Sequence, residues 1–453
     1  MHPALVAIAE ATRGSSFEND LWLVGGAVRD ELLSIPHEND FDLVTRGSSA
    51  ELAHLLRDKG LSSIPPVTYE RFGTAMVHVH GTNVEIVTAR RESYEEGSRK
   101  PTVEAATYEE DAARRDFTVN TLMRSIHSEE LWDPLGNGLD DLKGKVLRTP
   151  LDPGETFRDD PLRMLRAVRF RWKLGFEPAE GLYDSILATK QRLKIISNER
   201  IRDELLKMLQ QPTASEALND LMNLGLIEIF APELVPMKGC EQGKWHHLDV
   251  WDHSLLVLKN AGTGDIVLSL AALLHDVGKP ATRIIDEKGD TRFFSHEVVG
   301  ADIAAKLLRR LRIAQNEIDQ VVPLVRNHMR LGSFETFTPA AARRLVRDLG
   351  DQTERLLTLV EADANALKAG VRTMDLQQIR SRLAETKAQT PREALESPLS
   401  GEEIMEFLQL SPGRKVGELK NLLAEKVIEG ELQPNDKEAA KAMLTQEIEA
   451  KKG

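Results

Sequence analysis

Short apolar runs alternate with helical patterns over the first third of the chain. Between residue 21 and about residue 147 these runs are LWLVGG, FDLVT, TAMVHV, VEIVTA and KVLRTP. Short apolar runs bounded by turn residues predict strands, whereas apolar positions three and four apart predict helices. This part of the chain therefore predicts a domain in which a mixed sheet packs with helices.

After Pro150 the pattern becomes almost wholly helical. Apolar residues recur three and four positions apart, as on one face of a helix, in PLRMLRAVRFRWKLGF, ERIRDELLKMLQ, SEALNDLMNLGLIEIF, HSLLVLKNA, IVLSLAALLHDVG and ADIAAKLLRRLRIA. A segment with Pro and Gly, APELVPMKGCEQGKW, separates two helical blocks. The last helical patterns are GEEIMEFLQL, VGELKNLLAEKVIEG and KEAAKAMLTQEIEA, which carry high charge and few aromatic residues.

The length of 453 residues is too great for a single core. We expect an α+β chain of four parts. A head of strands and helices spans residues 1–148, and a helical neck and body spans residues 149–235. A second all-α domain follows over residues 236–372, and a helical acidic tail completes the chain over residues 373–453.

The composition is that of a soluble globular protein, with 41% hydrophobic and 29% charged residues. The N-terminal segment MHPALVAIAEATRG lacks a signal-peptide pattern, and no apolar run approaches the length of a membrane span. We therefore expect a cytoplasmic protein that does not interact with a membrane. The single cysteine, Cys240, excludes an internal disulfide and a cysteine-cluster zinc site. Any metal must be held by carboxylates and histidines.

The formal net charge of −13 argues against a protein that coats nucleic acid indiscriminately, because affinity for phosphates depends on Lys and Arg. The charge is unevenly distributed, however. The segment from Arg158 to Lys207 holds twelve Lys or Arg against eight Asp or Glu. This segment is the candidate for an RNA-docking surface.

Two polar features occur at the first apolar runs. Gly25 and Gly26 end a predicted strand and lead into a predicted helix from Ala27 to Leu33. Bare backbone N–H groups at such a turn can approach a phosphate at a helix N-terminus. Asp40 and Asp42 lie two apart in the next run, so in a strand both carboxylates share a face and can share divalent cations.

The order GGAVRD followed by NDFDLV resembles the head of the polymerase-β-like nucleotidyltransferases. More narrowly, it is similar to the class II bacterial tRNA CCA-adding enzymes and poly(A) polymerases. The resemblance implies a polymerase-β-like head with a mixed sheet, followed by an all-α neck and body. A further match, ERIRDELLKML, implies a helix that supports the neck, with a structural role and a basic face.

Phosphoryl transfer depends on positioning and on neutralising charge, most simply with two Mg²⁺ ions. Asp40 and Asp42 are the expected catalytic Mg²⁺ ligands. Glu85, in the run VEIVTAR, is a candidate third catalytic carboxylate, and the alternative is a paired structural acid. Arg29 is expected to reach triphosphate oxygens, and Asp30 to orient the loop after the glycines.

The segment RRDFTVNTL resembles the sugar-recognition motif of the family. The resemblance implies that Arg115, Asp116 and Asn120 contact or position the ribose and the triphosphate. The polar segment between Arg90 and Asp111 matches the flexible loop of the family, and its length matters for specificity.

Base selection is assigned to DDPLRMLRAVRF, where Asp160 and Arg163 are predicted to lie three apart on one helix. An ionised Asp only accepts and an Arg only donates, so the pair fits the Watson–Crick edges of cytosine and adenine and refuses uracil and guanine. The alternative is a surface ion pair. In relatives the motif resembles E-D-x-x-R, and Asp159 replaces the Glu that braces the arginine. Two further arginines of this run are expected to bind nucleotide, Arg166 and Arg169.

A second set of residues resembles the H…HD…D pattern of the HD phosphohydrolases. Its members are His253, His275, Asp276 and Asp363. His296 and His328 lie between them, as in members with a second metal or a phosphate-binding site. Such ligands suit Mg, Mn, Fe, Ni or Zn, and the HD fold can also persist after hydrolysis is lost. The remaining histidines considered are expected to take no part, namely His37, His78, His80, His246 and His247.

We therefore expect an enzyme that adds C, C and A to the 3′ end of tRNA from CTP and ATP and releases pyrophosphate, without a nucleic-acid template. The RNA would be recognised by shape and phosphates. Alternatives are a CC-only or A-only enzyme and a poly(A) polymerase. A different class is an HD phosphohydrolase with a degenerate head, and another is a small-molecule nucleotidyltransferase, which the basic neck disfavours.

Overall fold

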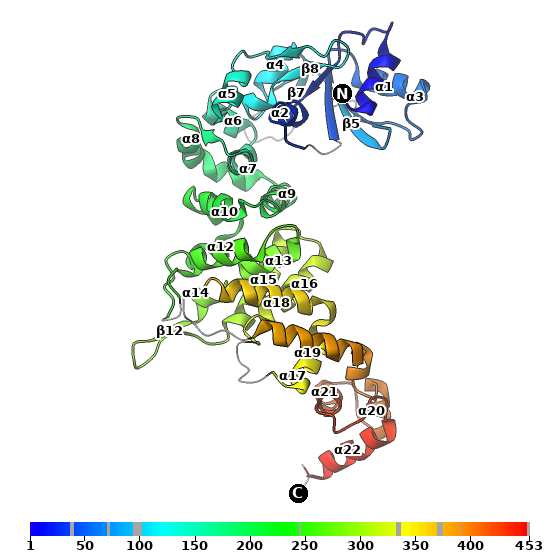
Figure 1. The fold of residues 1–453 in the computed structure, drawn as a ribbon, viewed down its shortest axis with the longest axis vertical. Coiled ribbons are helices and arrows are strands. Elements are labelled where there is room, and N and C mark those ends of the chain that lie inside the picture. The colour runs from blue at the N-terminus through cyan, green and yellow to red at the C-terminus, as the bar shows by residue number, and fades with distance from the viewer. Residues whose placement is uncertain are drawn as a thin grey trace. The chain divides into compact units, whose positions relative to one another are not determined.

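The computed structural model describes residues 1–36, 40–69, 73–93, 102–243, 246–331, 337–368, 375–389 and 391–450 (Figure 1). His37 and part of the predicted loop after Arg90 lie outside these residues. The chain divides into two compact units. One comprises Met1–Met208 with Glu216–Phe230, and the other comprises Leu209–Ser215 with Ala231–Gly453. The finer division into four parts stays a prediction.

The first unit contains the predicted mixed sheet, which has seven strands in the order β3-β4-β5-β2-β1-β8-β9. The strands are β1 (Trp22–Val24), β2 (Asp40–Thr45), β3 (Val67–Tyr69), β4 (Thr74–Val79), β5 (Thr82–Thr88), β8 (Met123–Ser125) and β9 (Leu131–Trp132). β2 and β5 run parallel, while β1 lies antiparallel between β2 and β8. In β2 the buried Phe41 and Leu43 alternate with more exposed positions, so one face of this strand contributes to the core.

Helices and one hairpin complete the head. The helices are α1 (Pro3–Thr12), α2 (Gly26–Leu32), α3 (Ser49–Asp58), α4 (Tyr108–Ala113), η2 (Thr118–Asn120) and α5 (Gly138–Gly144). The hairpin pairs β6 (Arg90–Ser93) with β7 (Thr102–Ala105). The run KVLRTP, predicted as a strand, forms only the short β10 (Val146–Leu147), which pairs with β11 (Glu177–Pro178) outside the main sheet.

The following segment is helical, as predicted. Its elements are α6 (Pro153–Asp159), α7 (Arg163–Leu174), α8 (Leu182–Thr189), η3 (Lys190–Ile195), α9 (Asn198–Leu209), α10 (Ala214–Asn223) and α11 (Ile227–Phe230).

The prediction that Asp160 and Arg163 share one helix is wrong. Helix α6 ends at Asp159, and Asp160 is extended with φ −132° and ψ 97°. The cause is Pro161, because a proline ring disfavours the helical conformation of the residue before it. Arg163 is the first residue of α7, so the two side chains belong to different elements.

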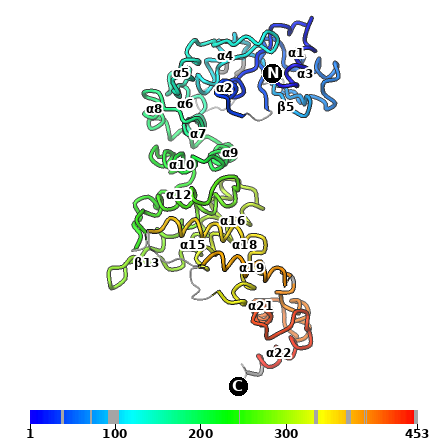
Figure 2. The backbone as a smooth tube through the Cα atoms, in the orientation of Figure 1, coloured from blue at the N-terminus to red at the C-terminus, as the bar shows by residue number. Residues whose placement is uncertain are grey.

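The second unit is mainly helical (Figure 2). Its elements are η4 (Pro232–Met237), α12 (Val250–Ala261), α13 (Ile266–Leu274), α14 (Lys279–Thr282), α15 (His296–Arg310), α16 (Gln315–Asn327), α17 (Pro339–Leu349), η5 (Gly350–Gln352), α18 (Thr353–Ala364), α19 (Leu376–Gln389) and η6 (Arg392–Leu395). One hairpin was not predicted and pairs β12 (Arg283–Ile285) with β13 (Thr291–Phe293). These strands are too short to show a clear period of two.

The predicted tail helices are present as α20 (Gly401–Leu408), α21 (Arg414–Glu429) and α22 (Lys437–Ala450). They share a small apolar core. Their acidity has a structural use, because Glu425 of α21 pairs with Arg344 and Arg347 of α17 at 2.6 and 2.9 Å. No helix in the described part of the chain is long and apolar enough to span a membrane.

Candidate active site

The glycine turn lies directly against a carboxylate of the sheet. Gly25 follows β1 with φ +76°, a conformation that favours glycine. A Cβ atom at this position would lie 3.3 Å from Oδ2 of Asp42 and 3.7 Å from a guanidinium nitrogen of Arg115. Helix α2 begins at the next residue, Gly26. The structure therefore brings the glycine turn and the carboxylate of Asp42 side by side.

Three carboxylate side chains project from the same face of the sheet. Asp40 and Asp42 are two apart on β2, and Glu85 is the register partner of Asp42 on β5. Burial raises the pKa of Asp42 to about 6, and the charges of Glu85 and Asp40 contribute although Arg115 opposes them. Burial and the charge of Asp40 also raise the pKa of Glu85. Clustered carboxylates that resist ionisation are a donor set suited to a hard divalent cation.

Arg29 is buried beneath the turn, with 3% of its side chain exposed. It pairs with Asp30 at 2.6 Å and donates to Oδ1 of Asn120 at 2.5 Å. Asn120 in turn donates from Nδ2 to Oδ1 of Asp116 at 3.0 Å. Arg29 therefore braces the turn from within the protein, whereas its position after the glycines predicted that it would reach triphosphate oxygens.

The network continues into the helical neck. Arg166 donates to Oδ2 of Asp116 at 2.9 and 2.5 Å and lies 3.5 Å from Glu204 of α9. Arg169 donates from Nε to Glu204 at 2.6 Å, and both side chains are buried. The ring of Phe170 lies 5.3 Å from the guanidinium of Arg166 and 4.3 Å from that of Arg169. Arg166 and Arg169 are therefore held in a preformed polar network.

The pKa of Asp116 predicts how acid acts on this network. Burial opposes the charge, but Arg166 and Asn120 outweigh it and lower the pKa to about 2. The pKa of Asp116 is lower in the folded protein than in the unfolded chain. Ionised Asp116 therefore contributes to the free energy of unfolding above about pH 4, and this contribution is lost as the pH falls through about 2. Asp116→Asn should remove about 2 kcal/mol of this pH-dependent stability.

The measurement is the free energy of unfolding in urea at several pH values between 7 and 2.5. Asp140→Asn, at an exposed position of α5, is the matched control and should behave as the wild type. Parallel pH profiles for the wild type and Asp116→Asn would contradict the prediction.

The two candidate base-reading side chains do not pair with each other. Oδ1 of Asp160 accepts from the backbone N–H of Leu162 at 3.2 Å, and Oδ2 accepts from Arg200 at 2.7 Å. Arg163 donates to the backbone carbonyl of Arg114. The alternative of a surface ion pair between positions 160 and 163 is therefore wrong. Burial raises the pKa of the preceding Asp159, while the charge of Arg163 opposes this shift.

Asp111 is a site residue that sequence reasoning missed. It is fully buried, and it pairs with Arg114 at 2.7 Å and with Arg115 at 3.0 Å. Burial opposes its ionisation, but the two arginines lower its pKa. The signal was present in YEEDAARRD, because acids three and four residues before arginines meet them on a helix. Asp111 thereby positions Arg115 beside the glycine turn.

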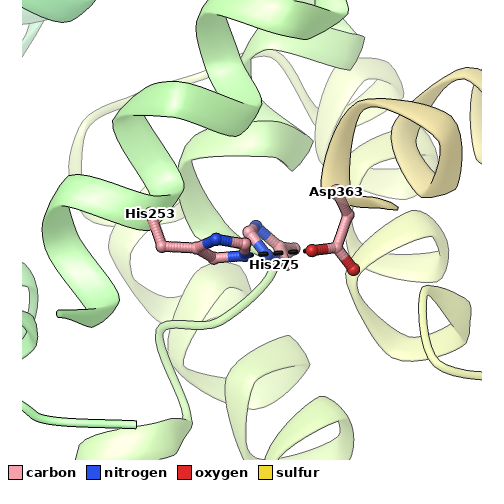
Figure 3. Close-up of side chains that lie close together, drawn as sticks. All are labelled: His253, His275 and Asp363. Carbon is pink, nitrogen blue, oxygen red and sulfur yellow. Dashed lines mark hydrogen bonds and ion pairs between the residues drawn. The ribbon is translucent and has the colours of Figure 1, made fainter. Parts of the chain in front are cut away.

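The second predicted set of residues also comes together. Figure 3 shows His253 of α12 and Asp363 of α18 directed toward each other beside His275, which directly follows α13. Nε2 of His253 donates to Oδ1 of Asp363 at 2.9 Å. One potential ligand atom from each of these three residues lies within 4.8 Å of the others. Burial opposes ionisation of Asp363, but the bond from His253 and the charge of His275 lower its pKa to about 2.

Asp276, His296 and His328 form a second buried group whose ligand atoms also lie within 4.8 Å of one another. Oδ1 of Asp276 is 3.3 Å from Nε2 of His296 and 3.6 Å from Nε2 of His328. The other carboxylate oxygen of Asp276 is 3.2 Å from Nε2 of His275. Asp276 therefore faces both groups, and all six predicted HD residues lie in one site.

The orientation of the imidazoles fits metal ligation. Nδ1 donates to a backbone carbonyl at 2.8 Å in His275, 2.8 Å in His296 and 2.7 Å in His328. Such a bond leaves the Nε2 lone pair directed into the site. Among the described residues, Nε2 of His275 and Oδ1 of Asp276 are buried without a hydrogen-bond partner. A cation would satisfy these atoms.

Two more residues border this site. Lys279 is buried and donates to Asp276 and to Gln242, both at 2.6 Å. The ring of His246 lies 4.7 Å from that of His253, and burial and the charge of Lys279 lower the pKa of His246 to about 3. His246 was expected to be a bystander, but the structure places it against a predicted ligand.

A glycine turn against strand carboxylates, followed by a neck and a His–Asp cluster, defines a nucleotidyltransferase with an HD-type domain. Family models agree, matching "Poly A polymerase head domain" over residues 21–148, "Probable RNA and SrmB- binding site of polymerase A" over residues 175–237 and "HD domain" over residues 246–366. The chain belongs to the class II CCA-adding group of the tRNA nucleotidyltransferase/poly(A) polymerase family, with an HD domain.

Two relatives support this assignment along most of their length. The chain is 38% identical to an A-adding tRNA nucleotidyltransferase of Deinococcus radiodurans, over 72% of this chain and 76% of the relative. It is 35% identical to a CC-adding tRNA nucleotidyltransferase of Thermus thermophilus, over 74% and 76% of the two chains.

Solved structures share the fold. The Bacillus stearothermophilus CCA-adding enzyme in complex with CTP aligns with a TM-score of 0.69 and 23% identity, covering 100% of this chain and 99% of that one. The Thermotoga maritima CCA-adding enzyme complexed with tRNA aligns with a TM-score of 0.57 and 20% identity, covering 99% and 96%.

Proposed function

We propose that this protein adds C, C and A to the 3′ end of tRNA, using CTP and ATP and releasing pyrophosphate without a nucleic-acid template. The observation that carries the proposal is the close approach of the Gly25 turn to the carboxylate of Asp42. Asp42 itself is the register partner of Glu85 on the neighbouring strand. The names of the relatives, which add CC or A to tRNA, support the substrate class. We also propose that the protein acts in the cytoplasm, as its sequence pattern led us to expect.

We assign different roles in phosphoryl transfer to different residues of the head. Asp40 and Asp42, with Glu85, would hold Mg²⁺, which activates the attacking 3′-hydroxyl oxygen and neutralises the leaving pyrophosphate. The backbone at Gly25 and Gly26 allows triphosphate oxygens to approach without a Cβ in the way. Arg115, 17% exposed and close to this turn, supplies positive charge next to the carboxylates.

The buried network positions these groups rather than reacting itself. Asp116 and Asn120 connect Arg29, beneath the turn, to Arg166 of α7, so the glycine turn and the neck are braced together. A preorganised polar network costs no rearrangement when charge develops during the reaction. The base is read by Asp160 and Arg163, whose opposite hydrogen-bonding roles match cytosine and adenine.

The proposed activity is tested with three tRNA substrates and one nucleoside triphosphate at a time. The substrates lack three, one or none of the terminal nucleotides. A CCA-adding enzyme extends the first with CTP and the second with ATP, and it leaves the complete tRNA unchanged. Extension beyond three nucleotides would instead indicate a poly(A) polymerase.

A second candidate is addition of A alone. It is favoured by the 38% identity to an A-adding relative. In that case ATP is added to tRNA ending in CC, and CTP is not added to tRNA lacking all three nucleotides. The same experiment therefore separates the two candidates.

For the second unit, we propose a divalent-metal site with phosphohydrolase chemistry, for which a 2′,3′-cyclic phosphate is the first substrate to test. The support is the convergence of the two ligand groups and the buried unpaired atoms between them. Imidazole and carboxylate ligands suit either Mg²⁺ or a divalent transition metal. Lys279, next to Asp276, provides a cation that can bind a phosphate oxygen.

Mn²⁺ should stabilise the protein through this site. At a hundredfold excess over the dissociation constant, binding contributes about 2.7 kcal/mol, which corresponds to a rise of about 5 °C in melting temperature. His275→Ala and Asp276→Asn should remove this contribution to the rise, while any stabilisation by Mn²⁺ at the head carboxylates and nucleotide addition by the head continue. The measurement is a thermal melt with and without Mn²⁺, together with the metal bound per protein molecule.

His247→Ala is the matched control, because His247 is exposed and comes from the same stretch of chain as His246. It should keep the full stabilisation by Mn²⁺. Equal Mn²⁺ stabilisation in His275→Ala and the wild type would contradict the site. Metal binding without any hydrolysis would leave the cation site in place and reject only the phosphohydrolase chemistry.

A further inference from the structure

Helix α9 presents two charged side chains toward the candidate base-reading region. Arg200 and Glu204 are four residues apart, so they lie on the same face of the helix. Glu204 is buried and accepts from Nε of Arg169 at 2.6 Å. This contact anchors α9 against α7, so that Arg200 projects from a fixed support.

Arg200 contacts the carboxylate of Asp160. Its Nη2 atom donates to Oδ2 at 2.7 Å, while Oδ1 accepts from the backbone N–H of Leu162. Asp160 lies between two helices in an extended conformation, so these contacts orient its side chain. A carboxylate oxygen has two acceptor sites, so each oxygen can still accept one more donor.

We propose that Arg200 is a positioning residue for base selection, which acts by fixing the carboxylate of Asp160 toward the amino group of an incoming cytosine or adenine. The inference rests on the proposed role of Asp160 in reading the base. When the carboxylate is fixed, it faces the carbonyl oxygen of uracil or guanine. Both groups are hydrogen-bond acceptors, so the contact is unfavourable. A carboxylate free to rotate avoids this contact, so the wrong base is refused less strongly.

The test is the incorporation of a single nucleotide by the full chain. The ratio of CTP to UTP is measured on tRNA lacking all three terminal nucleotides, and the ratio of ATP to GTP on tRNA ending in CC. Arg200→Ala should lower the ratio about threefold to tenfold, since the ion pair is partly exposed and of moderate strength. Arg200→Lys retains the positive charge and should recover part of the loss.

Arg202→Ala is the matched control. It removes the same charge from the same helix, but Arg202 pairs with Asp203 at 2.8 Å. The incorporation ratio should be unchanged in this variant, even if tRNA binds more weakly. In the Asp160→Ala background, Arg200→Ala should cause no further loss, because the group that it orients is absent.

The outcomes separate the two levels of the proposal. If Asp160→Ala lowers the ratio and Arg200→Ala does not, the inference is overturned while base reading by Asp160 stands. If Asp160→Ala leaves the ratio unchanged, the base-reading proposal fails and the inference fails with it. If Arg200→Ala lowers the melting temperature, the folded Arg200→Lys variant provides the test instead. An incorporation ratio for Arg200→Lys that is no higher than the ratio for Arg200→Ala overturns the inference.

Discussion

Replacing Asp40 or Asp42 by alanine is expected to abolish nucleotide addition, with a loss in turnover of at least about a hundredfold. Both carboxylates are expected to hold the same cations. Without one of them, the cations no longer stabilise the negative charge on the triphosphate and on the attacking oxygen. Binding of tRNA should change little, because we expect the RNA to contact the neck and body rather than these carboxylates. Single-turnover addition to tRNA and a separate tRNA binding titration check the two statements.

Asp58→Ala is the matched control for this experiment. Asp58 is an exposed aspartate of α3, and its removal should leave turnover unchanged. A variant of Asp40 or Asp42 that retains a tenth of the wild-type turnover would overturn the assignment of the catalytic carboxylates. Glu85→Gln separates the two interpretations of Glu85, since full turnover in that variant would leave it a structural acid.

Asp160→Ala and Arg163→Ala are each expected to lose discrimination between CTP and UTP by about tenfold to a hundredfold. A hydrogen bond to a charged partner is worth about 1.5 to 3 kcal/mol, and the pattern that refuses uracil disappears with either side chain. The measurement is incorporation of one nucleotide onto tRNA ending at the discriminator base. The overall rate should also fall, because the correct base loses the same contacts.

The control is Asp184→Ala, at an exposed aspartate of α8 in the same basic segment. Its CTP to UTP ratio should match the wild type. An unchanged ratio in both Asp160→Ala and Arg163→Ala would mean that base selection lies elsewhere. The segment from Arg91 to Tyr108 would then be the next place to examine.

The two sites differ in how the chain stabilises their charges. In the head, burial raises the pKa of Asp42 and of Glu85, and the charge of Asp40 contributes to both shifts. In the HD site, imidazoles and Lys279 stabilise the buried carboxylates, and the pKa of Asp276 falls well below its usual value although burial opposes this. We therefore expect the head to depend more strongly on bound cations than the HD site, whose carboxylates are compensated in part by neighbouring side chains.

The sequence by itself determined which side chains share a face within one element. Asp40 and Asp42 share a face because side chains alternate along a strand, and the glycines leave an open turn after the preceding strand. The HD ligands were indicated by their resemblance to the H…HD…D pattern, in which His275 and Asp276 are adjacent after an apolar run. The mixed head and the helical character of the rest follow from periodicities of two and 3.6 residues.

Only the tertiary structure decided the partners of the charged groups. Glu204 pairs with Arg169 across 35 positions of sequence, Arg166 pairs with Asp116 across 50, and Arg200 pairs with Asp160 across 40. Local spacing tells which way a side chain leaves its helix, but the packing of one helix on another sets what it meets. The error at Asp160 has a different, local cause, because Pro161 disfavours the helical conformation of the residue before it and so places the predicted pair on separate elements.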